Sequence, residues 1–166
     1  MAPTSFLSRR RLLLLAAPAA LAACGFELRK APNFAFSTVY VGGAESPLLT
    51  ELRRSIAASG AVQVVPVERA QVILDVPLDQ REKVVVALNS TGQVREFQLR
   101  TRVKFRLRTA QGKELIPETE LLQQRDISFN ESAVLAKEGE ENLLYRDMQT
   151  DIVQQLMRRL AAIKAL

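Results

Sequence analysis

The clearest pattern in the sequence is a strict alternation of side chains between Leu99 and Thr109. Successive side chains of a strand point to opposite faces, so this stretch has one face for a core and one for solvent. The core-facing positions are Leu99, Thr101, Val103, Phe105, Leu107 and Thr109. The other face carries five cations, Arg100, Arg102, Lys104, Arg106 and Arg108. The pattern predicts a long, half-buried strand within residues 94–109.

Shorter apolar runs bounded by turn-forming residues predict further strands. They cover residues 38–41, 72–76, 83–88 and 113–129. Asn89 to Gly92 and Ala110 to Gly112 have the composition of hairpin turns. Pro117 marks an edge position or a bulge in the last strand. Residues 62–67, interrupted by Pro66, fit no single assignment.

Two segments have helical periodicity. Ser46 and Pro47 form a typical helix start and Gly60 a typical stop, which predicts a helix over residues 47–59. Nearer the C-terminus, apolar residues recur every three or four positions, at Leu144, Met148, Ile152, Leu156, Leu160 and Ile163. We therefore expect an α+β fold, a two-layer sandwich in which two helices pack on one face of a four- to five-stranded, mostly antiparallel sheet.

The N-terminal segment has a different character. Arg9 to Arg11 precede a short apolar run that is broken by Pro18 and is shorter than the roughly 20 residues of a membrane-spanning helix. The sequence Leu21-Ala22-Ala23-Cys24 matches the lipobox of bacterial lipoproteins. We expect residues 1–23 to be a signal peptide, exported by the general or the twin-arginine route. Cys24 is then the lipidated residue, carrying covalent diacylglyceryl and N-acyl lipid.

Removal of this segment lowers the net charge of the chain that remains. The formal net charge of +5 falls because three arginines and no acids leave with residues 1–23, so the whole-chain charge is poor support for a nucleic-acid partner. The chain has no His, and Cys24 is its only Cys, so a metal site is not expected. Residues 24–36 read as a lipidated N-terminal tether and residues 37–166 as a single domain.

The row of five cations needs acids or an anionic partner beside it. If the turn at 110–112 pairs Thr109 with Lys113, Arg108 faces Glu114, Lys104 faces Glu118 and Arg102 faces Glu120. Arg100 and Arg106 would stay unpaired, and a bulge at the turn or at Pro117 would shift the register. The alternative is a surface for a polyanion, and in this compartment lipopolysaccharide is the abundant one, whose phosphates suit Arg.

Catalysis has little support in the sequence. No nucleophile elbow, glycine-rich phosphate loop or metal-spaced cluster occurs. Glu118, Glu120 and Glu140 are explained as surface charges of strands and of a helix start. We therefore expect a protein that is not an enzyme and that needs no cofactor.

Several short motifs resemble the LptE family of lipopolysaccharide-assembly lipoproteins. The family's Cys-Gly-Phe-x-Leu-Arg start stands at residues 24–29, and Ser46-Pro47-Leu48 and Glu96-Phe97-Gln98-Leu99 follow in order. The clearest matches are Ala133 to Glu138 and the helix ending at residues 154–160. The likeness spans nearly all of the mature chain, and the order and spacing of the motifs carry it more than any single one.

This resemblance implies two helices on a four-stranded sheet, anchored to the outer membrane on its periplasmic side. It also implies a plug inside the β-barrel protein LptD, which the domain helps to assemble, and binding of lipopolysaccharide. One family cation matches Lys137. Another lies in a hairpin where this chain has Ser90, and Arg95 stands a few residues on as a substitute. The lipopolysaccharide-binding candidates are therefore Lys137, Arg95, Arg100 and Arg106.

A second hypothesis belongs to a different class. The chain would be a free, periplasm-facing envelope lipoprotein that binds an anionic ligand or a scaffold without a barrel partner. Its stability and abundance would then not depend on a barrel protein.

Overall fold

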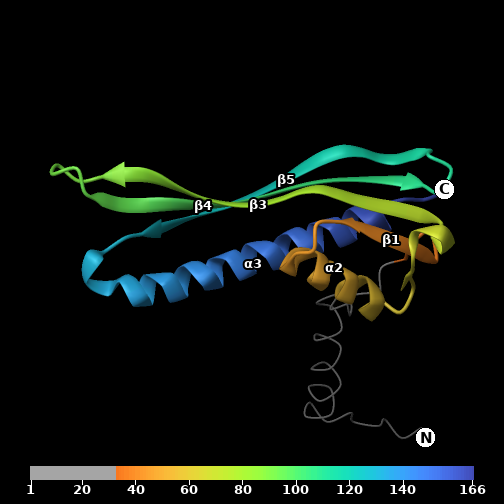
Figure 1. Cartoon of the computed structure of the whole chain (residues 1–166), viewed down its shortest axis with the longest axis horizontal. Helices are drawn as coiled ribbons and strands as arrows, with labels where there is room; N and C mark the ends of the chain where they lie inside the picture. Colours follow the sequence, from red (N-terminus) through yellow and green to blue (C-terminus); the bar gives the residue numbers. More distant parts are fainter. Residues whose placement is uncertain (1–32) are drawn as a thin grey trace, which may run out of the picture. The chain divides into compact units, whose positions relative to one another are not determined.

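The computed structural model describes residues 33–166. Five strands, two α-helices and two short 3-10 helices form in this part of the chain (Figure 1). In chain order these elements are β1 (Thr38–Gly43), α2 (Pro47–Ala58), β2 (Gln63–Val64), η1 (Val67–Arg69), β3 (Val72–Leu88), β4 (Val94–Thr109), β5 (Glu114–Ser128), η2 (Glu131–Ala133) and α3 (Val134–Ala161). The expected signal peptide, Cys24 and most of the 24–36 tether lie outside the described residues.

The strands form one mixed sheet in the order β2-β1-β3-β4-β5. β1 pairs in parallel with both of its neighbours, and the long β3–β4 and β4–β5 pairs are antiparallel. The antiparallel pairs are hairpins, whereas α2 and β2 lie in the chain between β1 and β3. The expected α+β class and the mostly antiparallel sheet are confirmed, and the parallel pairs at one side of the sheet are an addition to the prediction.

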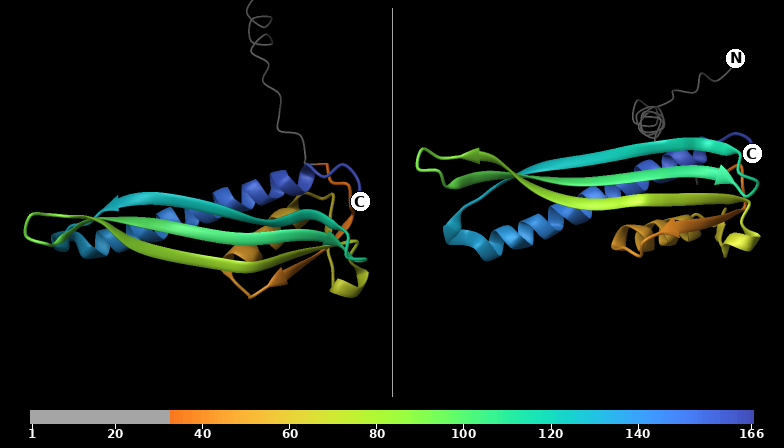
Figure 2. Two further views of the ribbon diagram at one scale, coloured as in Figure 1. Left: turned by 90° about the horizontal axis from the view of Figure 1, so that it is seen from above. Right: turned by 45° about the horizontal axis from the view of Figure 1, so that its top comes forward.

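Both α-helices cover the same face of the sheet (Figure 2). The core lies between the layers, where Leu52 of α2 and Ile152 of α3 meet Val39, Val103 and Phe105 of the sheet with no exposed surface. All six core-facing positions of the alternating strand are buried. Burial of large apolar side chains, at about 25 cal/mol per Å², holds the layers together and leaves the other face of the sheet open.

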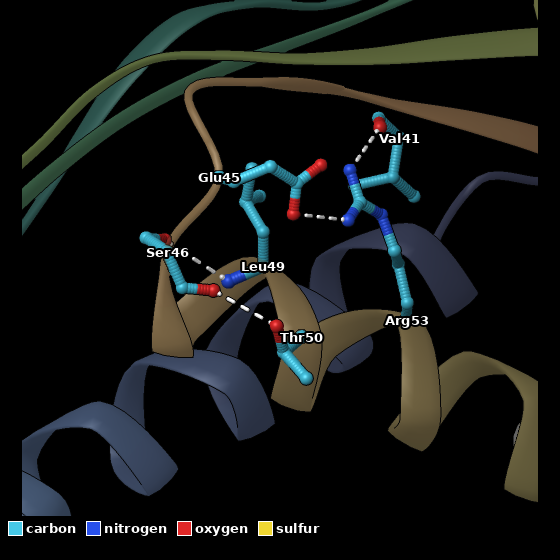
Figure 3. A network of polar contacts seen from close by, with 6 residues as sticks. All are labelled: Val41, Glu45, Ser46, Leu49, Thr50 and Arg53. Atoms are coloured by element: carbon cyan, nitrogen blue, oxygen red, sulfur yellow. Dashed lines mark hydrogen bonds and ion pairs between the residues drawn. The ribbon is translucent and has the colours of Figure 1, made fainter.

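The start of α2 shows why the chain folds locally as the sequence predicts (Figure 3). The Ser46 hydroxyl accepts a hydrogen bond from the backbone N–H of Leu49 at 3.3 Å and so caps the helix. One turn on, the Arg53 guanidinium donates to Glu45 at 2.8 Å and to the Val41 carbonyl of β1 at 3.1 Å. The hydrogen bond and charge of Arg53 lower the pKa of the Glu45 carboxyl.

One prediction about the strands needs correction. The separate strands expected at 72–76 and 83–88 are one continuous strand, β3. A bulge between Asp75 and Leu78 absorbs Pro77, which has no N–H for a ladder, and pairing with β4 resumes beyond it. The unassigned segment at 62–67 contains β2 and the start of η1. The strand expected at 94–109 has these bounds in the structure, and the helix at 47–59 ends one residue earlier.

Candidate functional site

The five cations of β4 lie on the open face of the sheet, opposite the helices. Acidic side chains from both neighbouring strands form ion pairs with four of them. Asp75 of β3 lies 3.1 Å from Arg106 and 3.3 Å from Arg108. Arg102 lies between Glu82 at 3.8 Å and Glu120 at 3.7 Å, and the Lys104 ammonium is 3.8 Å from Glu118. The open face therefore has mixed charge and is not a bare cationic row.

The predicted charge ladder is partly correct. Arg108 does face Glu114 across the hairpin, but a bulge between Phe105 and Arg108 shifts the register beyond it. Lys104 consequently faces Glu120 and Arg102 faces Leu122. The ion pairs Lys104–Glu118 and Arg102–Glu120 still form, along the diagonal of the ladder, because long side chains reach the next position on the same face.

Arg106 and Arg100 were both expected to be free cations. For Arg106 this is wrong, because Asp75 on β3 pairs with it, and the β4–β5 ladder alone could not show that partner. Arg100 makes no ion pair among the described residues, and its Nε donates to the Gln98 side chain at 2.8 Å. Among the five cations of β4, only Arg100 has no ion pair with a described residue.

A second group of cations gathers at the end of the molecule where the β3–β4 hairpin and the start of α3 lie together (Figure 1). A cavity of about 70 Å³ lies there, which we call the hairpin-end pocket. Apolar side chains, among them residues of β4, β5 and α3, form part of its lining, and two lysines, two glutamates and one serine complete it. The lining residues are Lys83, Phe97, Ile127, Ser128, Phe129, Val134, Lys137, Glu138 and Glu141.

Lys137 reaches the hairpin-end pocket from the first turn of α3. The Asn130 side chain accepts a hydrogen bond from the Ser132 N–H at 3.0 Å and starts the short helix η2, which leads directly into α3. The Lys137 ammonium donates to Ser128 at 3.0 Å and to Glu140 at 2.8 Å. Lys137 is thus held in place and partly neutralised.

Lys83 is the second cation of the hairpin-end pocket, and no pattern in the sequence marks it as a site residue. Its ammonium lies 4.4 Å from the centre of the Phe97 ring and donates to Glu141 of α3 at 2.6 Å. The only sequence signal was its place at the start of the predicted 83–88 strand. Its partner lies in a distant helix, so local patterning could not pair them.

Arg95 lies beside the hairpin-end pocket. It is exposed, and it lines a neighbouring hollow of about 100 Å³ with Gln93, Val94, Phe129 and Asn130. Phe129 borders both cavities, and its backbone N–H donates to the Arg95 carbonyl at 2.8 Å. The structure therefore brings Lys137 and Arg95 to the same end, whereas Arg100 and Arg106 lie on the open face of the sheet.

The hairpin-end pocket joins charge to apolar surface. Each lysine is bound to one carboxylate, so an incoming phosphate would compete with Glu140 and Glu141 for the ammonium groups. The Phe97 and Phe129 rings, in edge-to-face contact at 5.3 Å, form an apolar floor next to these charges. Such an arrangement suits a ligand with an anionic head and an apolar body.

Two further classes of feature do not occur in the described part of the chain. No helix between residues 33 and 166 is long and apolar enough to span a membrane. In the same range, no cluster of three or more His, Cys, Asp or Glu side chains is placed to hold a metal ion.

Several solved structures are similar to this chain in fold and sequence. A lipoprotein B of Nitrosomonas europaea, described as uncharacterized, is 36% identical over 83% of this chain and 91% of its own, with a TM-score of 0.73. The rare lipoprotein B of Shewanella oneidensis, at 24% identity, shares the fold with a TM-score of 0.64 and covers 76% of this chain and 95% of its own. A minor lipoprotein of Acinetobacter baumannii, at 21% identity, matches 79% of this chain and 94% of its own with a TM-score of 0.62.

The sequence was also compared with curated proteins and with family models. No curated protein gives a significant match. The model of the LptE family, described as lipopolysaccharide-assembly, matches residues 31–160. This match spans most of the chain and nearly all of its described part, so the chain belongs to the LptE family of lipopolysaccharide-assembly lipoproteins.

Proposed function

We propose that this protein is lipid-anchored to the outer membrane on its periplasmic side, plugs an LptD-type β-barrel and helps that barrel to assemble. We further propose that it binds lipopolysaccharide during insertion into the outer leaflet. Family membership supports the general role. The observation that carries the ligand proposal is the hairpin-end pocket, where Lys83 and Lys137 flank an aromatic floor.

The open face of the sheet supports the plug proposal. The lumen of an outer-membrane barrel is polar, so a domain that fills it needs a surface of balanced charge. The ion pairs of Asp75, Glu82, Glu118 and Glu120 with the β4 cations provide such a surface. Because Glu118 and Glu120 already serve in these pairs, we assign them no catalytic role.

The hairpin-end pocket supports the ligand proposal. Phosphates of the lipid A and core regions would replace Glu140 and Glu141 as partners of Lys137 and Lys83. Arg95, on the other side of Phe129, would add bidentate hydrogen bonds to a second anionic group. The anchor would be diacylglyceryl and N-acyl lipid on Cys24, with no other cofactor and no nucleic-acid partner.

The plug proposal is tested by purification of the tagged, full-length lipoprotein in mild detergent. We expect a large outer-membrane barrel protein to co-purify in a fixed ratio, and depletion of that barrel protein to lower the amount of the lipoprotein. A lipoprotein that is abundant and stable with no barrel attached would instead support the second hypothesis, a free envelope lipoprotein.

The ligand proposal is tested by replacing the half-buried Lys137 and the exposed Arg95 with acids. The double variant Lys137→Glu, Arg95→Glu should weaken lipopolysaccharide binding about tenfold, because two charge-assisted contacts become repulsive. Lys113→Glu, an exposed charge reversal at the opposite hairpin turn, is the matched control and should bind normally. Circular dichroism checks that each variant is folded. Unchanged binding would move the site to Arg100 and Arg106 on the open face.

A further inference from the structure

The most unusual surface of this domain is an edge of its sheet. β1 pairs with β3 only as far as Val76, where it faces Gly43. Beyond Pro77, residues 78–88 of β3 pair with β4 on one side only, and no described strand lies on the other. The backbone N–H and C=O groups on this side form a row about 33 Å long, at roughly 3.3 Å per residue. Apart from the Glu82 carbonyl, which accepts a hydrogen bond from Tyr145, they are available to pair with another strand.

The distal half of this edge has no charged residue and no proline to prevent pairing, and its one protection is a pair of register shifts between Val85 and Leu88. Natural proteins guard an open edge with charged residues, proline or a bulge that turns it away. Asp79, Arg81 and Lys83 supply charges nearer the centre. From Val84 to Leu88, five consecutive residues are apolar, and Val84, Val85, Val86 and Leu88 are between 36% and 59% exposed. Apolar side chains on both faces of an open edge are a template for another strand.

Helix α3 holds the proximal half of the edge extended. The Tyr145 hydroxyl donates to the Glu82 carbonyl at 2.7 Å, and Arg81 donates to the Gln149 side chain at 2.8 Å. The Lys83–Glu141 pair adds a third link to α3. A strand that is already ordered loses less conformational entropy when a partner binds it.

The charges beside the edge define the chemistry of the incoming segment. Arg81 is exposed and makes no ion pair within residues 33–166, where its contacts are Gln149 and the Tyr145 ring at 5.2 Å. An acidic side chain opposite Arg81 would be complementary to it. Apolar side chains opposite Val84 to Leu88 would cover the exposed valines.

We infer that the free edge of β3, residues 78–88, pairs with an extended segment of the barrel partner, which adds a further strand to this sheet. The segment is apolar where it faces Val84 to Leu88 and carries an acidic residue opposite Arg81. This inference rests on the proposed function for the identity of the partner. Main-chain hydrogen bonds supply affinity in this mode of recognition, and alternate side chains supply specificity.

Residue-resolved hydrogen exchange tests the pairing in the full lipoprotein, alone and in its complex with the barrel protein. Amides of β3 that already bond to β4 are protected in both states. Strand addition should therefore newly protect alternate amides within residues 78–88 of the complex. Equal protection of all of these amides, as acyl chains or side-chain packing would cause, overturns the inference, and so does no change. Concentration-dependent protection of the lipoprotein alone would assign the edge to a second copy of this chain and also overturns it.

A pair of variants gives an independent measurement. Val85→Lys places a charge on the open edge and should lower the yield of the complex about tenfold. Val67→Lys is the control, because Val67 is 41% exposed but lies in η1, away from this edge. Normal yield from both variants, with unchanged exchange, overturns the edge inference alone. Failure of the unaltered lipoprotein to bring down any barrel overturns the proposed function together with it.

Discussion

Tyr145 and Gln149 are polar side chains buried between α3 and its neighbours, one position beyond the apolar stripe of the helix. Gln149 donates to Glu51 of α2 at 2.6 Å and accepts from Arg81 of β3. Tyr145 donates to the Glu82 carbonyl. The periodicity that predicted α3 marks these residues as near the core, but it gives no information about partners on other elements.

Replacement of Tyr145 by Phe should lower the free energy of unfolding by about 1 kcal/mol, because the Glu82 carbonyl loses its hydrogen-bond donor in a site with little water. Tyr40→Phe is the matched control. The Tyr40 hydroxyl makes no hydrogen bond to any described residue, so this change should be nearly neutral. Urea unfolding of the two variants in the same detergent measures the difference, and equal stabilities would contradict this role of Tyr145.

The pH dependence of the Tyr145 contribution has a definite sign. Burial, and next the nearby Glu141 charge, raise the pKa of the Tyr145 phenol above the ordinary value of 10.0. A raised folded-state pKa means that this stabilisation is fully present below the unfolded pKa and is lost as pH rises through the folded one. The stability difference between the unaltered protein and Tyr145→Phe should therefore shrink at strongly alkaline pH.

At the scale of elements, β3 shows what local patterning cannot predict. Local patterning predicts two short strands, at 72–76 and 83–88, and leaves Pro77 and the polar run from Asp79 to Glu82 between them. In the structure each of these polar residues has a partner in the middle of β4, where Gln80 faces Arg102 and Glu82 faces Arg100. Strand formation depends on neighbours that lie far along the chain, so the interruption disappears when the sheet forms.

The predicted charge ladder has the wrong register beyond Arg108, but it places the acidic side chains on the correct face of the sheet, and one bulge explains both results. The turn at 110–112 correctly indicated that Arg108 faces Glu114, but nothing local announced the bulge near Phe105. The bulge moves the register by two, and a shift of two keeps every side chain on its own face. Glu118 and Glu120 therefore remain beside the basic row, although each faces a different residue than predicted.

At the scale of the molecule, the sequence was sufficient for the fold class, for both helices on one face and for the alternation of β4. The choice of Lys137 and Arg95 as ligand-binding candidates came from the family resemblance and stays a prediction, although the two residues line neighbouring cavities that share Phe129. The sequence did not predict the place of Lys83, whose ion-pair partner Glu141 lies in α3, or the Arg106–Asp75 pair, which forms across the sheet. Lipidation of Cys24 stays a prediction, since this residue lies outside the described part.

The mixed sheet also has a consequence for the order of folding. β3, β4 and β5 are joined by short turns, whereas β1 meets β3 only after α2 and β2 have been traversed (Figure 1). Closing that longer loop costs more entropy before any contact forms. We expect the hairpins to form in the folding transition state and β1 to dock after it.

Two fully buried valines test this order. Val103→Ala in β4 should slow refolding, whereas Val39→Ala in β1 should mainly speed unfolding. Stopped-flow kinetics of both variants distinguishes the steps, and slower refolding of only the β1 variant would reverse the proposed order. Because a chain is made from its N-terminus, β1 is synthesised before β3, and in the expected order its pairing with β3 waits until the two hairpins have formed.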